Sequence, residues 1–223
     1  MIMFSTEVIS FYKTLHLNTP LPKDVEVMNP YQDEDAFSIT KKFYKKFYND
    51  NNLRTMLIGI NPGRFGGGIT GVPFTDPGKL EINCGIANPF MKKPELSADF
   101  VYKVVESFGG ANKFFSQFYI TAMSPLGFTK ENKNLNYYDI PQLKTAVEPF
   151  IIRCLSTQTK FPINKKKVFC LGEGENYKYL AKLNERHLFF NDIVPLPHPR
   201  FIMQYRRKSL NEYVERYKIA LTS

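Results

Sequence analysis

Apolar residues form two kinds of pattern along the chain: short continuous runs and stripes with helical spacing. The short runs predict four buried strands, at Thr55–Ile60, Phe118–Ala122, Lys167–Leu171 and Asp192–Leu196. The stripes predict helices over 4–16, 35–49, 96–108, 141–156 and 207–220, with another that follows Gly172 and ends near Lys182. The segment from Pro20 to Asp35 is rich in proline and acidic residues and predicts a loop.

Strands that alternate with helices imply right-handed crossovers and a mostly parallel sheet. The fold class expected is therefore α/β, a three-layer α/β/α sandwich with a mostly parallel four-stranded central sheet. Residues 1–223 are expected to form a single domain, with 1–50 a helical extension packed on it. Ligands bind at the carboxyl ends of the strands in such sheets. One cleft is thus expected between four segments, Asn61–Phe74, Thr121–Leu126, Gly172–Glu175 and Pro197–Arg200.

The net charge of the chain indicates a class of binding partner. Thirty Lys and Arg residues against 21 Asp and Glu residues give a net charge of +9, which favours polyanions such as nucleic acids without identifying one. Basic residues cluster at Arg206-Arg207-Lys208 and at Lys165–Lys167, the latter expected in a solvated turn before a strand.

Cysteine spacing and hydropathy bear on metal binding and on the compartment in which the protein works. Cys84, Cys154 and Cys170 have no metal-like spacing and are odd in number, so reduced, buried thiols are expected and no metal or cofactor site is predicted. No apolar run approaches the roughly 18 residues of a membrane span. The N-terminus has no basic leader. We therefore expect a cytoplasmic protein with no membrane partner, and a monomer.

The most distinctive stretch runs from Gly59 to Phe74 and reads GINPGRFGGGITGVPF. Asn61 leaves a strand end before a proline, which favours extended backbone at that point. The glycines after it allow sharp turns and a close approach of main-chain amides to a ligand. Phe65 and Phe74 offer flat faces to a planar guest, unless the stretch is only a connector whose phenylalanines enter the core. Its glycine spacing fits neither the P-loop nor the dinucleotide fingerprint.

The segments Asn61-Pro-Gly-x-Phe-Gly and Thr70-Gly-Val-Pro-Phe74 resemble the first motif of the single-strand-selective monofunctional uracil-DNA glycosylases. The resemblance implies that Asn61 positions the attacking water. It also implies that Phe65 lies against the base pocket and that Phe74 stacks on a base flipped out of DNA. Backbone amides near Gly63 and Gly67 would then bind the carbonyl groups of the base.

The second motif of that superfamily follows the last strand and begins with His-Pro, as Pro197-His198-Pro199-Arg200 does here. The resemblance implies that His198 stabilises the negative charge on the departing base and that the following loop wedges into DNA. The family loop usually reads His-Pro-Ser-Pro-Arg, whereas here Arg200 follows His-Pro directly. The wedge candidates are therefore Arg200, Phe201, Ile202 and Met203. The phosphate-binding candidates are Gln204, Arg206, Arg207 and Lys208.

The middle strand departs from the family pattern. The family has an asparagine that reads the pairing edge of the base, but this chain has Ala122 at that position. Thr121 and Ser124 are candidates to contribute to the pocket in its place. Asp76 is a candidate carboxylate helper or, more simply, a cap for the turn at Asp76-Pro77-Gly78.

These motifs predict a monofunctional DNA glycosylase for base-excision repair, acting on DNA with a deaminated base: uracil first, with xanthine or hypoxanthine as alternatives. Two other functions stay open. One is a DNA-binding module with altered catalysis, and the other is a hydrolase of free nucleosides or nucleotides.

Overall fold

The central sheet has four strands, all parallel, in the order β3-β2-β6-β7. The structure, a computed structural model, describes residues 2–223. The strands are β2 (Arg54–Gly59), β3 (Phe118–Ala122), β6 (Ile163–Leu171) and β7 (Ile193–Leu196). This confirms the predicted four-stranded sheet. Lys165–Lys167 lie inside β6, so the solvated turn expected there is wrong.

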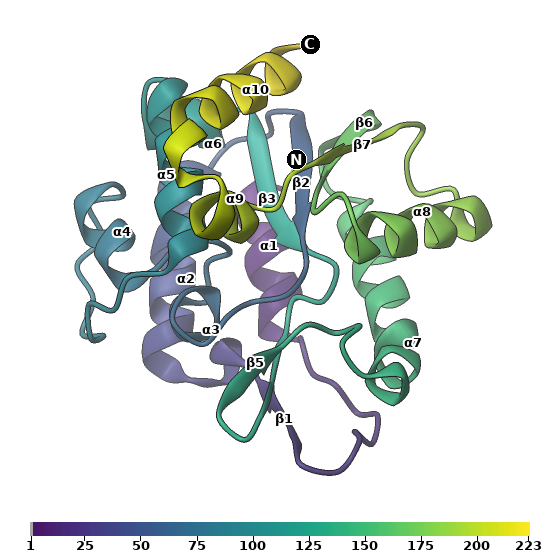
Figure 1. Ribbon diagram of the computed structural model, residues 1–223. Helices are drawn as coiled ribbons and strands as arrows, with labels where there is room; N and C mark the ends of the chain where they lie inside the picture. The colour runs from purple at the N-terminus through teal and green to yellow at the C-terminus, as the bar shows by residue number, and fades with distance from the viewer. Residues whose placement is uncertain (1) are drawn as a thin grey trace.

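Helices cover both faces of the sheet (Figure 1). The helices α1 (Phe4–Lys13), α7 (Pro141–Gln158) and α8 (Glu175–His187) lie on one face. The helices α5 (Leu96–Ser107) and α10 (Leu210–Thr222) lie on the other. The three-layer α/β/α architecture predicted from the alternation of strands and helices is therefore confirmed.

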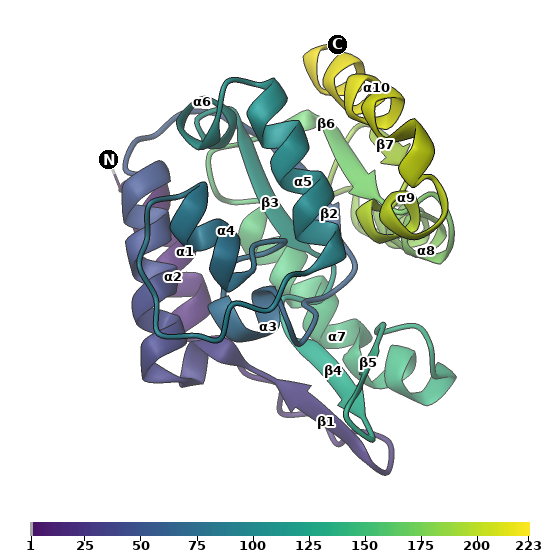
Figure 2. The same cartoon turned by 60° about the vertical axis from the view of Figure 1, so that its left-hand side comes forward.

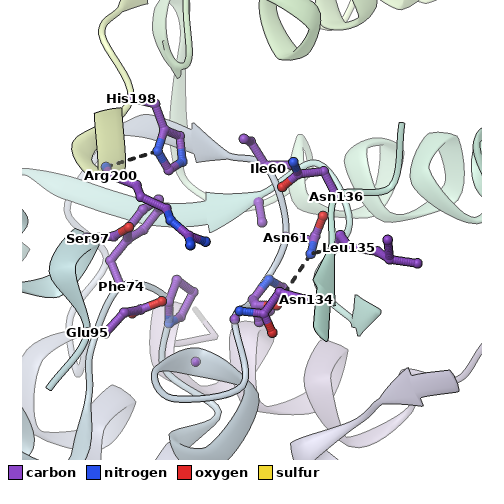
Figure 3. Close-up of a pocket in the computed structure, with 15 residues that line it drawn as sticks. Ile60, Asn61, Phe74, Glu95, Ser97, Asn134, Leu135, Asn136, His198 and Arg200 are labelled. Carbon is purple, nitrogen blue, oxygen red and sulfur yellow. Dashed lines mark hydrogen bonds between the residues drawn. The ribbon is translucent and has the colours of Figure 1, made fainter. Parts of the chain in front are cut away.

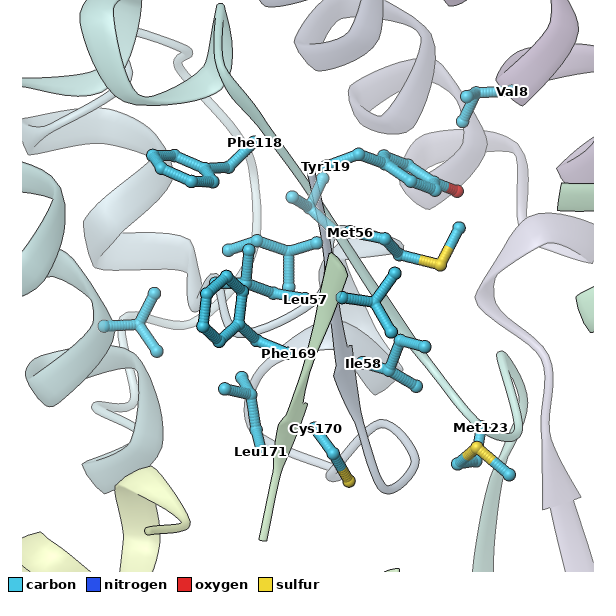
Figure 4. Close-up of a cluster of buried hydrophobic side chains, with 14 of the residues drawn as sticks. Val8, Met56, Leu57, Ile58, Phe118, Tyr119, Met123, Phe169, Cys170 and Leu171 are labelled. Atoms are coloured by element: carbon cyan, nitrogen blue, oxygen red, sulfur yellow. The ribbon is translucent and has the colours of Figure 1, made fainter. Parts of the chain in front are cut away.

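Side chains of the central strands alternate between the two helical layers, as the period of a strand requires. In Figure 4, Phe118 and Phe169 point to one side of the sheet, whereas Tyr119 points to the side of Val8 in α1. The hydroxyl groups of Tyr119 and Thr121 both donate to Oε1 of Gln158 in α7, at 2.9 and 2.7 Å. The polar atoms on this strand face are thus satisfied within the core.

The N-terminal helices are joined to the sheet through a buried arginine. Arg54, at the start of β2, has no exposed surface. Its guanidinium group pairs with Asp50 at 2.8 Å and lies 4.7 Å from the ring centre of Phe4 and 4.6 Å from that of Tyr48. Because an unpaired buried charge costs several kcal/mol, these partners make Arg54 a stable link between α1 and the central strand. The helix α2 (Glu34–Phe47) packs on α1 beside it.

A second, antiparallel sheet of three strands, β1-β4-β5, projects from the carboxyl end of the central sheet (Figure 2). Its strands are β1 (Val25–Met28), β4 (Gly127–Lys130) and β5 (Lys133–Leu135). The prediction of a loop over 20–35 is therefore wrong for Val25–Met28, which form β1. This short strand is mostly solvent-accessible and forms because it pairs with β4, about a hundred residues later, which no local pattern indicates. Glu131 and Asn132 have positive φ and form the tight turn between β4 and β5.

Several short helices lie in segments for which the sequence analysis predicts no helix or strand. They are α3 (Gly67–Thr70), α4 (Pro77–Ile82), α6 (Ala111–Phe115) and α9 (Pro199–Tyr205), with 3-10 turns at Pro30–Gln32 and Arg207–Ser209. The last of these turns moves the start of the final helix from the predicted 207 to 210. Cys84, Cys154 and Cys170 are buried and free, as expected. Within residues 2–223, every helix is too short or too polar to cross a membrane.

Candidate active site

A cavity opens at the carboxyl ends of β2, β3 and β7, and we call it the strand-end cavity (Figure 3). The residues that line it are Ile60, Asn61, Pro62, Gly63, Gly67, Pro73, Phe74, Glu95, Ser97, Ala122, Asn134, Leu135, Asn136, His198 and Arg200. Three of the four segments predicted to meet here do so. The fourth, Gly172–Glu175, contributes no residue to this lining.

Asn61 is held by the backbone of the segment that follows β5. Its Oδ1 accepts a hydrogen bond from the Tyr137 amide at 2.9 Å, and its Nδ2 donates to the Leu135 carbonyl at 3.0 Å. An amide oxygen has two lone pairs, so Oδ1 retains one for a further partner. The carboxamide is thus fixed in orientation before any ligand arrives, and it retains one acceptor position.

The glycine-rich loop folds tightly enough to begin the short helix α3. The carbonyl of Gly63 accepts from the amides of Gly66 and Gly68 at 3.2 and 2.9 Å. A Cβ at Gly68 would lie 2.7 Å from that carbonyl oxygen, so only glycine fits this turn. The amide of Gly67, within residues 2–223, donates to no backbone or side-chain acceptor. Gly67 lines the cavity, and its amide is a candidate donor for a carbonyl group or an anion.

Phe74 closes one side of the strand-end cavity in a strained backbone conformation, with φ at 52°. Its ring fills the space beside Gly59, where a Cβ would lie 2.6 Å from a ring carbon. The turn before it is fixed by the Thr70 hydroxyl, which donates to the Thr75 carbonyl at 2.7 Å and accepts from the Val72 amide at 3.1 Å. The Thr-Gly-Val-Pro-Phe segment therefore holds an aromatic ring in one position at the cavity.

His198 presents a neutral imidazole to the strand-end cavity. It caps α9, where Nδ1 accepts the amide of Arg200 at 3.1 Å. Since Nδ1 is an acceptor, the ring proton of the neutral form lies on Nε2. Burial and, to a smaller extent, the nearby Arg200 together lower the pKa of His198 to about 4. Near neutral pH the ring therefore offers one N–H donor and carries no charge. The ring of Phe74 lies beside it, with 5.9 Å between the centroids.

Sequence reasoning missed the wall that α5 and the small sheet contribute. Glu95 and Ser97 come from the start of α5, and Asn134 and Asn136 from β5 and the loop after it. The pKa of Glu95 is raised to about 7, chiefly by burial and also by the carboxylates of Asp76 and Asp99, while Arg200 acts in the opposite direction. Glu95 belongs to no sequence motif, and its position depends on the direction in which the chain enters α5.

Asp76 is a structural cap. Its Oδ1 accepts the amide of Lys79 at 2.9 Å at the start of α4, and its Oδ2 accepts the amide of Glu95 at 3.0 Å. Both oxygens are engaged, and Asp76 is outside the cavity lining. The capping interpretation is confirmed, and Asp76 positions the chain at Glu95.

Three residues predicted for the pocket lie outside the lining. Phe65 lies beside a neighbouring hollow, where the Lys93 ammonium is 4.0 Å from its ring centre. Thr121 faces α7 and donates to Gln158, because its strand neighbour Ala122 takes the cavity side. The Ser124 hydroxyl donates to the Leu126 carbonyl at 2.7 Å.

The helix α9 divides the wedge candidates by burial. Ile202 has no exposed surface and Met203 is 6% exposed, because this side of α9 packs on α5. Their burial contradicts the expectation that either one enters DNA. Phe201 is 41% exposed, and Arg200 is also exposed. Gln204, Arg206, Arg207 and Lys208 are all exposed, as is Tyr205, whose ring centre lies 5.6 Å from that of Phe201.

Residues 2–223 contain no group of three or more His, Cys, Asp or Glu side chains arranged to hold a metal ion. The polar side chains of the strand-end cavity are the amides of Asn61, Asn134 and Asn136, the hydroxyl of Ser97, the guanidinium of Arg200, the neutral imidazole of His198 and the Glu95 carboxyl group with its raised pKa. Such a set can orient a water molecule and donate hydrogen bonds to a planar leaving group.

Comparisons with known proteins agree on one family. The family model described as "Uracil DNA glycosylase superfamily" matches residues 45–222. The crystal structure of wild-type SMUG2 from Pedobacter heparinus is similar over 100% of this chain and 98% of that one, with a TM-score of 0.96 and 43% sequence identity. No curated protein sequence matches the chain.

Proposed function

The chain belongs to the uracil-DNA glycosylase superfamily and is a DNA glycosylase of base-excision repair, and we propose that it removes a flipped deaminated base as a monofunctional enzyme. Uracil is the base proposed first, with hypoxanthine and xanthine as alternatives. The observation that carries the proposal is that Asn61 and the neutral His198 line one cavity, each with its orientation fixed by backbone hydrogen bonds.

Base capture is the first step of the proposed reaction. A glycosylase must flip its base out of the stack because the sugar bond is otherwise unreachable, at a cost of a few kcal/mol. Stacking on an aromatic ring returns about 1–3 kcal/mol per base. Phe74 is the ring proposed for this role, since it lines the strand-end cavity and its backbone is held in one conformation.

Bond cleavage is the second step. The oxygen of a water molecule bonds to C1′ of the sugar, and the electrons of the N-glycosidic bond leave with the base. One proton of the water ends on the base or in solvent. Asn61 is too weak a base to take that proton, so its role is to orient the water through the free lone pair of Oδ1.

The departing base carries the developing negative charge, and the cavity offers donors for it. The Nε2–H of His198 and the free amide of Gly67 are the two proposed here. One well-placed donor is typically worth about 10²–10³ in rate. A neutral imidazole suits this role because its N–H donates a hydrogen bond and keeps its proton.

A monofunctional mechanism fits the lining of the strand-end cavity. An enzyme that also cleaves the sugar-phosphate chain forms an imine between an amine and C1′. Within residues 2–223, the side chains that line this cavity include no lysine. Water is therefore the nucleophile proposed.

The experiment that tests the proposal uses labelled oligonucleotides with a single uracil, hypoxanthine or xanthine, single- and double-stranded, treated with alkali after incubation. Scission at the modified position only after alkali is the expected result. Binding to DNA with every substrate intact would instead favour the DNA-binding module. Equal turnover of free nucleosides would favour the nucleoside hydrolase, and a borohydride-trapped DNA adduct would overturn the monofunctional mechanism.

A further inference from the structure

Glu95 is a carboxyl group that lies directly against the glycine-rich loop. A Cβ at Gly66 would lie 2.0 Å from its Oε2, and one at Gly63 would lie 2.9 Å from its Oε1. These two glycines therefore leave the space that the carboxyl group fills. Glu95 lines both the strand-end cavity, as Figure 3 shows, and the adjoining hollow lined by Arg64, Phe65 and Lys133.

The carboxyl group of Glu95 is unpartnered within residues 2–223. Its oxygens take part in none of the hydrogen bonds or ion pairs of this part of the chain, although Arg64 and Arg200 line the same hollow. The neighbouring Asp76, in contrast, has both oxygens engaged by backbone amides. The Glu95 side chain is half-buried and lines the cavity, so its free oxygens are available to a ligand there.

Burial and two neighbouring carboxylates disfavour the ionised form of Glu95. Burial is the largest cause of its raised pKa of about 7, and Asp76 and Asp99 add to it. Asp99 is itself paired with Lys79 at 2.9 Å, and Arg200 acts in the opposite direction. Arg64 and Lys133 are the other charged residues of the adjoining hollow, and His198 across the strand-end cavity is neutral near pH 7. Near neutral pH a large share of Glu95 is therefore a carboxylic acid.

We propose that Glu95 determines specificity by pairing, as a neutral carboxylic acid, with the lactam edge of the flipped base. This inference rests on the proposed glycosylase function and names the group that reads the base. A lactam edge is an adjacent C=O and N–H, which uracil, hypoxanthine and xanthine carry and which cytosine and adenine lack. A protonated carboxyl group donates through one oxygen and accepts through the other, so it matches both atoms.

The rest of the lining leaves this role open. Ala122 has no polar atom, and it occupies the place where the family has a base-reading asparagine. The carboxamide of Asn61 is held by Tyr137 and Leu135. The oxygen of Asn134 accepts the amide of Arg64 at 3.1 Å. Glu95 brings two adjacent and unengaged oxygens.

The test compares the wild-type protein with Glu95→Gln and Glu95→Ala, by single-turnover cleavage of a uracil oligonucleotide from pH 5.5 to 9. The wild-type rate is expected to fall by about tenfold per pH unit above pH 7, as the acid ionises. Gln also has a donor and an acceptor, so E95Q is expected to stay within about threefold of wild type at pH 6 and not to fall above pH 7. E95A is expected to lose about tenfold at pH 6, as a hydrogen-bonding group is lost.

Glu106→Gln and Glu106→Ala are the matched controls, since Glu106 is an exposed residue of the same helix, outside the cavity lining. Melting temperatures establish that each variant is folded. Equal rates in E95Q and E95A, or a wild-type rate flat through pH 7, would overturn the proposal. A rate that rises through pH 7 and is lost in both variants would overturn it too, because the carboxylate would then be the active form. Failure of the wild-type protein to release any base at pH 6 is a different outcome, which refutes the glycosylase function itself.

Discussion

The strand-end cavity and the exposed side of α9 lie next to each other and are built differently. In the cavity, Asn61 and His198 are held by four hydrogen bonds to the backbone. On the exposed side of α9 and the turn after it, Phe201, Tyr205 and Arg206 contact mainly one another. We call this group, with Arg200, Gln204, Arg207 and Lys208, the α9 surface.

The difference separates two tasks that a glycosylase must perform. Groups that stabilise a transition state work best when they are fixed in advance. Groups that grip a flexible polyanion act through charge and exposed area. Changes in the cavity should therefore reduce the chemical step, whereas changes on the α9 surface should reduce DNA binding.

His198 joins the two regions, since it lines the cavity and caps α9. The largest expected effect is for His198→Ala, which removes the Nε2–H donor and should lower the single-turnover rate by about 10²–10³ with little change in DNA affinity. Single-turnover rates and fluorescence-anisotropy titrations measure the two quantities.

His198→Asn is the matched variant for the cap. Asn is a favourable N-cap residue, so it keeps an acceptor for the Arg200 amide while the imidazole donor is lost. Restoration of the wild-type rate in H198N would mean that His198 acts by capping α9. As the pH is lowered through 6.5 the wild-type rate should not fall, because His198, with its pKa lowered to about 4, stays neutral until the pH approaches that value.

Asn61→Ala is the next prediction. Loss of the carboxamide should lower turnover by at least about tenfold with the fold retained, since the water loses its orienting acceptor. Cleavage rates and a melting curve measure this. Asn112→Ala, at an exposed position of α6, is the control. A wild-type rate in N61A would remove Asn61 from the mechanism.

Sequence predicts the fixed region far better than the rest of the site. The strands β2, β3, β6 and β7 are short buried runs with strong local patterns, and the motifs that begin near Asn61 and His198 lie directly after β2 and β7. Asn134 and Glu95 reach the cavity only through tertiary structure. Asn134 lies in β5, which pairs with β4 in the small sheet, where β4 also pairs with the distant β1; the position of Glu95 depends on the path of the chain into α5.

The burial of α9 residues likewise has no local signal. The stretch Phe201-Ile-Met reads as three equivalent apolar residues, and only the packing of α9 on α5 separates the exposed Phe201 from the buried Ile202. The sequence therefore proposes a loop for DNA contact, but it does not separate the exposed side chains of that loop from the buried ones.

Phe201→Ala and Ile202→Ala test this distinction between the exposed and the buried side of α9. Ile202→Ala should lower the free energy of unfolding by about 2–5 kcal/mol, because it leaves a void in the core. Phe201→Ala should leave the melting temperature nearly unchanged. It should slow cleavage of a double-stranded substrate severalfold more than that of a single-stranded one, since an inserted apolar side chain offsets the cost of unstacking a duplex.

Melting curves and paired single- and double-strand rates decide the outcome. Equal slowing of both substrates by F201A would mean that Phe201 is not the wedge. Arg200 would then be the remaining exposed candidate among the four.

Arg206→Ala gives the smallest expected effect and the most direct test of the α9 surface. Each phosphate contact contributes about 0.7–0.9 to the slope of log K against log salt, so the loss of one contact should flatten the slope by about that amount. Arg153→Ala is the matched control, since it removes the same charge at an exposed position of α7, on the opposite face of the sheet. If both variants lower the slope equally, the effect is one of net charge. A slope changed only in R206A assigns the phosphate contact to the α9 surface, and a slope unchanged in R206A places Arg206 away from the DNA backbone.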